Sequence, residues 1–443
     1  MLHRPLVMEV LEAALRAAEP YAAVTAALRE RPEAAEALAS LSSTGQVYVV
    51  GAGKAGAAMA LAVEDALGDR ITRGMVIIKE GSFPAGEGAR LPARIQLTEA
   101  GHPIPDDRGV AATAWALNIA ARAAEGDLVV CLISGGGSAL LAAPAEGLSL
   151  GDVQAVTGAL LRNGATINEL NAVRKHLSRV SGGRLARAAH PARVLSLVLS
   201  DVTGSPLDVI ASGPTSPDPT TYADAVRVLR SRGAWDDAPA SVRKRLEAGA
   251  AGQIEETPKP GDLIFKGVEN VLVASNVTSV EAAAERAREL GLNTLIVSTF
   301  VEGEARDVGT MLAGIAREMS ERGRPVQRPG CLLFGGETTV TLRGHGVGGR
   351  NSELALSAAL GLQGLGPGAL VASLATDGDD GASPGAGAIV DGTTAERARE
   401  HGLDPRRYLD ENDSYTLLAK LGDAIVTGPT GTNVNDVMAV FAF

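Results

Sequence analysis

Short, largely apolar stretches alternate along the chain with longer segments in which apolar and polar residues follow helical spacing. Apolar stretches without polar alternation are typical of strands buried in a parallel sheet, and they occur at 47–50, 75–78, 128–133, 194–199, 271–274, 294–298, 331–334, 370–375 and 437–441. Helical spacing predicts helices between them over 55–67, 109–125, 278–290, 351–360 and 393–401. This alternation predicts an α/β fold with a mostly parallel sheet covered on both faces.

The length of the chain predicts more than one domain, because 443 residues exceed what a single hydrophobic core usually fills. A polar stretch at 249–262 has the composition of a linker or hairpin tip. We therefore expect a larger N-terminal α/β domain over 1–255 and a second α/β domain over 256–443. Residues 6–29 show amphipathic spacing that Pro20 interrupts, which predicts two helices before the first strand.

Composition excludes several classes of function. A net charge of −11, a pI near 5.2 and 3% aromatic residues argue against a nucleic-acid surface. Cys131 and Cys331 lie inside predicted strands, as inert thiols of a reducing compartment do. The six histidines show no zinc-ligand spacing, and no apolar run is long enough to span a membrane. Charged residues near the start do not fit a signal peptide, so we expect a cytoplasmic protein.

A glycine-rich turn follows the predicted strand at 128–133. Its residues are Ser134, Gly135, Gly136, Gly137 and Ser138, and a short helical pattern comes next. Glycines let a ligand approach the backbone, and N–H groups at a strand-to-helix turn favour anions. The alternative is a tight connection without a ligand. Three successive glycines between two serines favour anion binding.

Two further strand–glycine turns suggest a polyanionic substrate held from several sides. One carries Gly51, Gly53 and Gly56 after strand 47–50, and the other carries Gly335, Gly336, Glu337 and Thr338 after strand 331–334. The first matches the dinucleotide fingerprint, with Glu80 just past the next strand. Lys54 inside this turn suits a transferring phosphoryl group, although a solvated lysine is the alternative.

Single charged residues next to these turns are candidates for the chemistry. Asp201 and Asp377 each come directly after a predicted strand, where a carboxylate can hold Mg²⁺, accept a substrate proton or merely cap a turn. Arg350 follows two glycines and can grip a carboxylate or phosphate, unless it is a surface arginine. Glu337 is a further metal or hydroxyl partner. The polar residues within 167–176 are predicted to form a solvent-exposed helix face. His102 is predicted to anchor its loop and not to act as a catalytic base.

With these motifs in place, the sequence closely resembles the glycerate 2-kinase family, also called the MOFRL family and once labelled hydroxypyruvate reductase. The matching stretches are GAGKA (51–55), GHPIPD (101–106), SGGGSALL (134–141), NAVRKHLS (171–178), LSDVTGSPLDVIASGPTSPD (199–218), GGETTVTLRG (335–344), GGRNSELAL (348–356), ATDGDDG (375–381) and TGPTGTNVND (427–436). They span nearly the whole chain. One departure is Ser181, where the family usually has a lysine before two glycines.

The resemblance implies ATP-dependent phosphorylation of D-glycerate at the 2-hydroxyl, with Mg²⁺, in a cleft between a Rossmann-like and a MOFRL-type domain. It also implies that Lys54, Asp201 and Arg350 are the active-site residues, with Asp201 as base or metal partner. From their positions after strands, Asp201 and Asp377 are the candidate metal ligands. The three glycine turns are assigned to the nucleotide: Gly51, Gly53, Ser134, Gly135, Gly136, Gly137, Ser138, Gly335, Gly336, Glu337 and Thr338.

Two other functions fit part of the pattern. A nicotinamide-dependent hydroxypyruvate reductase, using NAD(P)H, fits the turn at 51–56 but leaves the other two turns unexplained. A non-catalytic sugar-phosphate sensor would use the same turns without chemistry. The expected partners are D-glycerate and ATP, without nucleic acid or membrane, and a homo-oligomer is compatible with the sequence.

Overall fold

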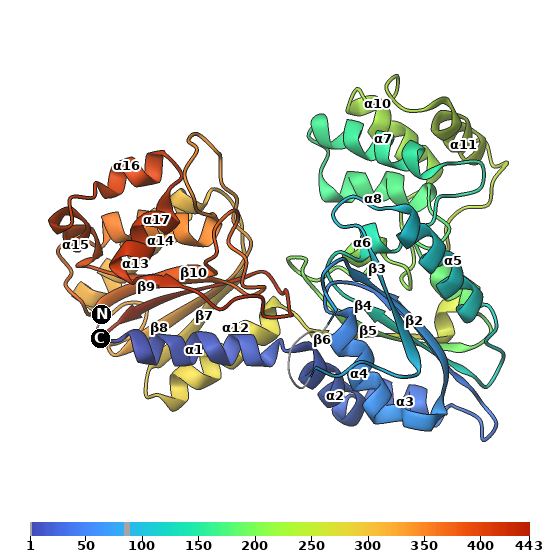
Figure 1. Ribbon diagram of the computed structural model, residues 1–443, viewed down its shortest axis with the longest axis horizontal. Helices are drawn as coiled ribbons and strands as arrows, with labels where there is room; N and C mark the ends of the chain where they lie inside the picture. The colour runs from blue at the N-terminus through green and yellow to red at the C-terminus, as the bar shows by residue number, and fades with distance from the viewer. Residues whose placement is uncertain (1, 84–88) are drawn as a thin grey trace. The chain divides into compact units, whose positions relative to one another are not determined.

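The computed structural model describes residues 2–83 and 89–443, and the chain divides into two compact units, each an α/β domain (Figure 1). We call Pro20–Ser200 together with Ser205–Val273 the N-terminal unit. The residues up to Glu19, Asp201–Gly204 and Ala274–Phe443 form the C-terminal unit. The sequence-based division into 1–255 and 256–443 differs from this at both ends of the N-terminal unit.

Helix α1 (Arg4–Ala17) and strand β6 (Val268–Ala274) account for the difference. The apolar face of α1 packs against α12 (Asn276–Glu289), where it shares a core with residues of the C-terminal unit. Strand β6 is the edge strand next to β5 (Arg193–Leu199) in the sheet of the N-terminal unit. The pairing of β6 with β5 therefore places the C-terminal boundary of the N-terminal unit at the end of β6, and the burial of the apolar face of α1 assigns that helix to the C-terminal unit.

The N-terminal unit contains a six-stranded sheet in the order β3-β2-β1-β4-β5-β6. Strands β1 to β5 pair in parallel, as predicted. The first four strands are β1 (Val47–Ala52), β2 (Ile71–Lys79), β3 (Ile95–Ala100) and β4 (Leu128–Ile133). This is the strand order of dinucleotide-binding folds, in which ligands bind beyond the carboxyl ends where the order reverses. The reversal lies between β1 and β4, which end in register at Ala52 and Ile133.

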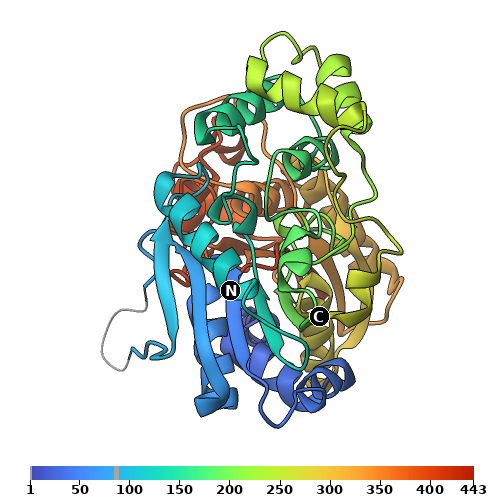
Figure 2. The same cartoon turned by 90° about the vertical axis from the view of Figure 1, so that its right-hand side faces the viewer.

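Helices surround this sheet and also form a cluster of their own. They are α2 (Pro20–Glu30), α3 (Pro32–Ala39), α4 (Gly56–Leu67), α5 (Asp107–Ala120), α6 (Gly137–Leu140), α7 (Leu150–Arg162), α8 (Ile167–His176), α9 (Arg184–Ala189), α10 (Tyr222–Ser231) and α11 (Ala240–Ala250). Helices α7, α8, α10 and α11 share a separate apolar core, and Figure 2 shows α10 and α11 at one end of the unit. The stretch 249–262 is not a linker, because Tyr222 and His176 of this cluster bond to Glu256.

The C-terminal unit contains a second six-stranded sheet, in the order β11-β10-β9-β12-β8-β7. Its strands are β7 (Asn293–Val301), β8 (Gly330–Gly336), β9 (Ala369–Ala375), β10 (Gly387–Asp391), β11 (Ala424–Ile425) and β12 (Asp436–Ala442). Only β7 and β8 pair in parallel, and the other four pairs are antiparallel. The predicted parallel arrangement therefore describes the first sheet and not the second.

Helices cover both faces of this second sheet, which explains its apolar strands. Alternate residues of β8, β9 and β12 pack under α13 (Ala305–Arg322) and α14 (Arg350–Gly361), and the others pack on α1 and α12 (Figure 1). Three short helices, α15 (Thr394–Glu400), α16 (Pro405–Asp410) and α17 (Ser414–Leu421), complete the unit. Cys131 and Cys331 are fully buried, and burial raises the pKa of Cys131 to about 12, so this thiol is inert.

Candidate active site

The glycine turns after β1 and β4 dock against each other at the point where the strand order reverses. The amide of Lys54 donates to the carbonyl of Gly135 at 2.9 Å, and the amide of Ala55 donates to the hydroxyl of Ser134 at 3.1 Å. Gly53 has a positive φ of 149°, and a side chain there would collide with Ser134. The two turns therefore form one structure, which we call the glycine cradle (residues 51–56 and 134–138).

The side chains of Lys54 and His102 lie over Gly136 of the glycine cradle. Gly136 adopts a left-handed φ of 83°, and a Cβ there would come within 2.9 Å of the His102 ring and 3.5 Å of the Lys54 chain. Burial and the charges of Lys54 and Lys79 lower the pKa of His102. The lowered pKa favours the neutral imidazole form of His102.

Ser138, at the far end of the cradle, holds the long loop that follows β5. Its hydroxyl lies 2.9 Å from the hydroxyl of Ser212, which donates to Asn171 of α8 at 2.8 Å. Ala211 and Ser212 both have positive φ, so this loop is locally strained. The three polar side chains fix the loop to the cradle, and this contact gives Ser138 a structural role besides the predicted nucleotide contact.

Helix α8 is not the solvated polar face that the sequence favoured. Lys175 is 2% exposed, and its ammonium lies 3.2 Å from Asp208 and 3.3 Å from Asp218. His176 is fully buried between the carbonyl of Ala172 at 2.7 Å and the carboxylate of Glu256 at 3.1 Å. Burial acts to raise the pKa of Glu256, but the bond from His176 and further donors outweigh it and lower the pKa to about 2.

In the C-terminal unit, the turn after β8 is held by its neighbours. The amide of Glu337 donates to the carbonyl of Val301 at 2.9 Å, and Thr338 is buried. Gly335 packs so closely on the side-chain oxygen of Asn276 that any larger residue would collide with it. The amide nitrogen of Asn276 donates to the carbonyls of Val434 and Asp436, at 2.9 Å each. The third glycine turn is thus joined to the segment before β12.

Arg350, the first residue of α14, is bound by an acidic residue that the sequence analysis did not single out. Its Nε and Nη2 donate to the two carboxylate oxygens of Asp436 at 2.6 and 2.8 Å, and its Nη1 lies 3.4 Å from Glu337. Burial acts to lower the pKa of Arg350, but Asp436, Glu337 and Asp377 raise it above its usual value. Arg350 is therefore a fixed, charged guanidinium and not a mobile surface arginine.

Asp436 itself is completely buried at the start of β12. Burial raises the pKa of this carboxyl to about 6, against the opposing effect of its bonds from Arg350 and Asn351. The side-chain amide nitrogen of Asn351 donates to Asp436 at 3.0 Å. An aspartate at the start of an apolar strand gives no sequence signal by itself, since its partner lies 86 positions away.

The predicted metal ligands lie in separate turns. Asp201 belongs to the short segment Asp201–Gly204, which packs with the C-terminal unit, where Asn435 donates to the Thr203 hydroxyl at 3.4 Å. Asp377 follows β9 and accepts from the amide of Asp379 at 3.0 Å. Across residues 2–83 and 89–443, no three His, Cys, Asp or Glu side chains gather into a metal site. Mg²⁺ in kinases commonly uses one or two carboxylates with the substrate phosphates, so these oxygen donors still fit it.

Comparison with known proteins identifies the family. Residues 6–247 match a domain of unknown function, DUF4147, and residues 330–436 match the MOFRL family. A curated glycerate 2-kinase of Pyrococcus horikoshii is 45% identical over 437 residues, covering 98% of this chain and 96% of the relative. The chain belongs to the MOFRL family of glycerate 2-kinases. A relative from Agrobacterium vitis, 44% identical over 99% of this chain and 94% of its own length, is named putative hydroxypyruvate reductase.

A solved structure supports the same family assignment. The crystal structure of a glycerate kinase from Thermotoga maritima superposes with a TM-score of 0.88 at 41% identity, covering 99% of each chain. The α/β fold of this chain is therefore similar to that of a solved glycerate kinase. Within the described residues, no helix combines the length and apolar character that crossing a bilayer requires.

Proposed function

We propose that this protein transfers the γ-phosphoryl group of ATP to the 2-hydroxyl of D-glycerate, giving 2-phospho-D-glycerate and ADP. The observation that carries the proposal is the glycine cradle at the strand-order reversal, with the Lys54 side chain packed over it. Backbone turns of this kind suit phosphates, and a lysine supplies a point charge for a phosphoryl group in transfer. The names of the relatives support the same reaction.

In this proposal the 2-hydroxyl oxygen of glycerate attacks the γ-phosphorus of ATP. The bond from that phosphorus to the β–γ bridging oxygen breaks, ADP leaves, and the hydroxyl proton passes to the Asp201 carboxylate. Lys54 offsets the charge on the transferring group. Arg350, held by Asp436, binds the glycerate carboxylate or the transferred group with the edge of its guanidinium that Asp436 does not use.

In this proposal the glycine turns bind the nucleotide phosphates. Glu337 and Thr338 stand at the third of these turns, beside Arg350. Mg²⁺, when bound, shields the phosphate charge, and Asp201 and Asp377 are the carboxylates that we assign to it. Asp201 is thus a candidate for two roles, base and metal ligand.

The first experiment separates this function from its alternatives. Purified protein is incubated with D-glycerate, ATP and Mg²⁺, and the product is passed to enolase without phosphoglycerate mutase. We expect enolase to consume the product directly, since it acts on the 2-phosphate. A requirement for the mutase would indicate phosphorylation at the 3-hydroxyl instead.

A hydroxypyruvate reductase remains the second candidate, because the sheet order and the 51–56 turn also fit a dinucleotide. Oxidation of NADH or NADPH by hydroxypyruvate, in the absence of ATP, would establish it and contradict the kinase. Nucleotide or sugar-phosphate binding without any turnover would favour the non-catalytic sensor. We expect neither result, because a nicotinamide cofactor would use only the turn at 51–56 and would leave the turns at 134–138 and 335–338 without a ligand.

The variant Asp201→Asn distinguishes the two roles of Asp201. If the carboxylate is the base, as we favour, kcat should fall by about 10²-fold, the usual weight of a positioned base, and extra metal should not restore it. If it is a metal ligand, high Mg²⁺ or Mn²⁺ should restore part of the rate. The measurement is kcat against metal concentration, with Asp379→Asn as the matched control. Full activity in Asp201→Asn would exclude both roles, since asparagine replaces aspartate well as a cap.

A further inference from the structure

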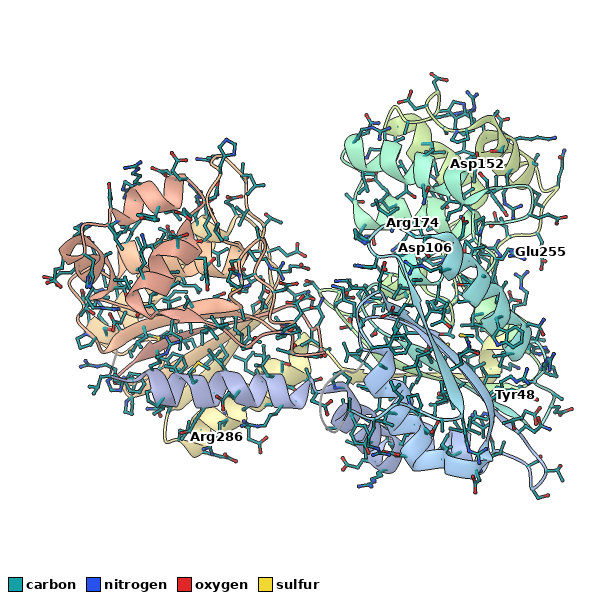
Figure 3. The ribbon with its side chains drawn as sticks, in the orientation of Figure 1. Tyr48, Asp106, Asp152, Arg174, Glu255 and Arg286 are labelled. Atoms are coloured by element: carbon teal, nitrogen blue, oxygen red, sulfur yellow. The ribbon has the colours of Figure 1, made fainter. Side chains whose placement is uncertain are left out.

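A pocket of about 860 Å³ lies in the N-terminal unit, beyond the carboxyl ends of β2 and β3. Its lining comes from Lys79 and Glu80 at the end of β2, from residues 101–108 between β3 and the start of α5, and from the N-terminal part of α7. Figure 3 labels Asp106, which lies where the sheet meets the helical cluster. The volume is that of a site for a medium-sized organic ligand. A three-carbon acid would leave most of it unfilled.

The residues that line the pocket include both apolar and charged side chains. The apolar ones are Pro103, Ile104 and Leu150, and Ile104 is 68% exposed although it is a large apolar residue. Among the charged ones, Arg108 donates to Glu80 at 2.9 Å. A flat heterocyclic base fits the apolar side chains, and a pair of ribose hydroxyls fits the Glu80 carboxylate.

Glu80 occupies the position at which dinucleotide-binding sheets of this strand order carry a ribose-binding acidic residue. In dinucleotide-binding sheets the phosphates lie at the turn after the first strand, and an acidic residue after the second strand binds the ribose hydroxyls. Here the glycine cradle follows β1, and Glu80 comes directly after β2. A carboxylate accepts several hydrogen bonds, so Glu80 can keep Arg108 and still accept from a ribose.

His102 connects this pocket to the glycine cradle. It lines the pocket, and the same ring packs over Gly136 beside Lys54. Lys79, which also lines the pocket, and Lys54 both act on the His102 ring through their charges. A ligand with a nucleoside in the pocket would therefore extend its phosphates past His102 toward Lys54, between positive groups.

We propose that this pocket holds the nucleoside of the phosphoryl donor, with the base against Pro103, Ile104 and Leu150 and the ribose hydroxyls on Glu80. This inference rests on the proposed kinase function and assigns the adenosine moiety to the N-terminal unit. Lys54 then stands at the phosphate end of the same nucleotide. The acceptor, glycerate, does not use the pocket.

A variant that fills the pocket tests this assignment without turnover. Gly151, in the first turn of α7, lines the pocket, and a Cβ there would meet only Ser149 at 3.7 Å. Gly151→Phe should therefore fold, occupy the space of the base and weaken ADP binding about 10-fold or more, measured by calorimetric titration with ADP alone. Ala155→Phe, an exposed position on the same helix outside the pocket, should bind ADP like the wild type.

A second variant tests the ribose contact and does not depend on the first. Glu80→Gln should weaken ADP binding about 10-fold, because it removes a charged hydrogen-bond acceptor. The wild type should bind 2′-deoxy-ADP more weakly than ADP, and Glu80→Gln should lose most of this preference. A purely structural role of Glu80 would leave the preference intact.

The outcomes separate this inference from the function on which it rests. If the wild type binds ADP and both Gly151→Phe and Glu80→Gln bind it equally well, the pocket assignment is wrong and the kinase proposal stands. If Gly151→Phe raises the KM for glycerate and leaves ADP binding unchanged, the pocket belongs to the acceptor, which also contradicts the assignment. A wild type that binds no ADP at all contradicts the kinase proposal itself.

Discussion

Replacing Lys54 with alanine is expected to lower kcat by about 10²–10³-fold, the usual effect of removing one group that stabilises transition-state charge. The KM for glycerate should change little. The structure places the Lys54 side chain over Gly136 and anchors its backbone to Gly135, so the ammonium stands at the turn that we assign to the phosphates. A charge aimed at the phosphoryl group in transfer stabilises the transition state more than the bound substrate. Steady-state kinetics of both substrates measure this split.

The matched control for this prediction is Lys244→Ala, which removes an exposed lysine of α11 in the same unit. It should leave kcat and both KM values unchanged. Lys54→Arg keeps the charge but replaces a compact ammonium with a larger planar group, so we expect only partial recovery of kcat. Near-normal turnover of Lys54→Ala would make Lys54 the solvated lysine that the sequence alone left as the alternative.

Much of the fold could be predicted because strands buried on both faces leave apolar runs in the sequence. The runs at 128–133 and 331–334 became β4 and β8 within a residue or two at each end. Strand β3 was not predicted, because it is an edge strand whose residues Gln96 to Glu99 are polar or partly exposed. The antiparallel pairing of the second sheet also escaped prediction. Strands covered by helices on both faces look alike in sequence whichever direction they run.

In the candidate site, features set by neighbouring residues could be predicted, and contacts between residues far apart in sequence could not. Glycine turns after strands are local signals, and the structure joins two of them into the glycine cradle. The pairing of Arg350 with Asp436 joins residues far apart in sequence, so neither residue alone predicted it. The same reason explains α8. The buried Lys175 ammonium is paired with Asp218, and the buried His176 ring bonds to Glu256, and both acidic residues come from distant loops.

Replacing Arg350 with alanine is expected to lower the free energy of unfolding by about 3–5 kcal/mol at pH 8, the usual cost of leaving one member of a buried ion pair alone. Asp436 is fully buried, and the Arg350 side chain is 25% exposed, so solvent screens this pair little. Urea unfolding monitored by circular dichroism provides the measurement. The control is Arg322→Ala on α13, which removes a solvent-accessible pair with Glu318 and should cost less than about 1 kcal/mol. Activity should also fall, because the proposed anion-binding group is lost.

The pH dependence of this variant tests the cause. Burial already raises the pKa of Asp436 to about 6 with Arg350 present, and without that guanidinium it should rise further. A carboxyl with a raised folded-state pKa favours folding while it is protonated and loses that contribution as the pH rises through the folded-state value. The destabilisation by Arg350→Ala should therefore be small at pH 5 and grow toward pH 8.

The double variant Arg350→Ala/Asp436→Asn removes the buried charge and should be more stable than Arg350→Ala at pH 8. Equal losses at both pH values, or no recovery in the double variant, would show that Arg350 stabilises the unit by packing and not by holding the charge of Asp436.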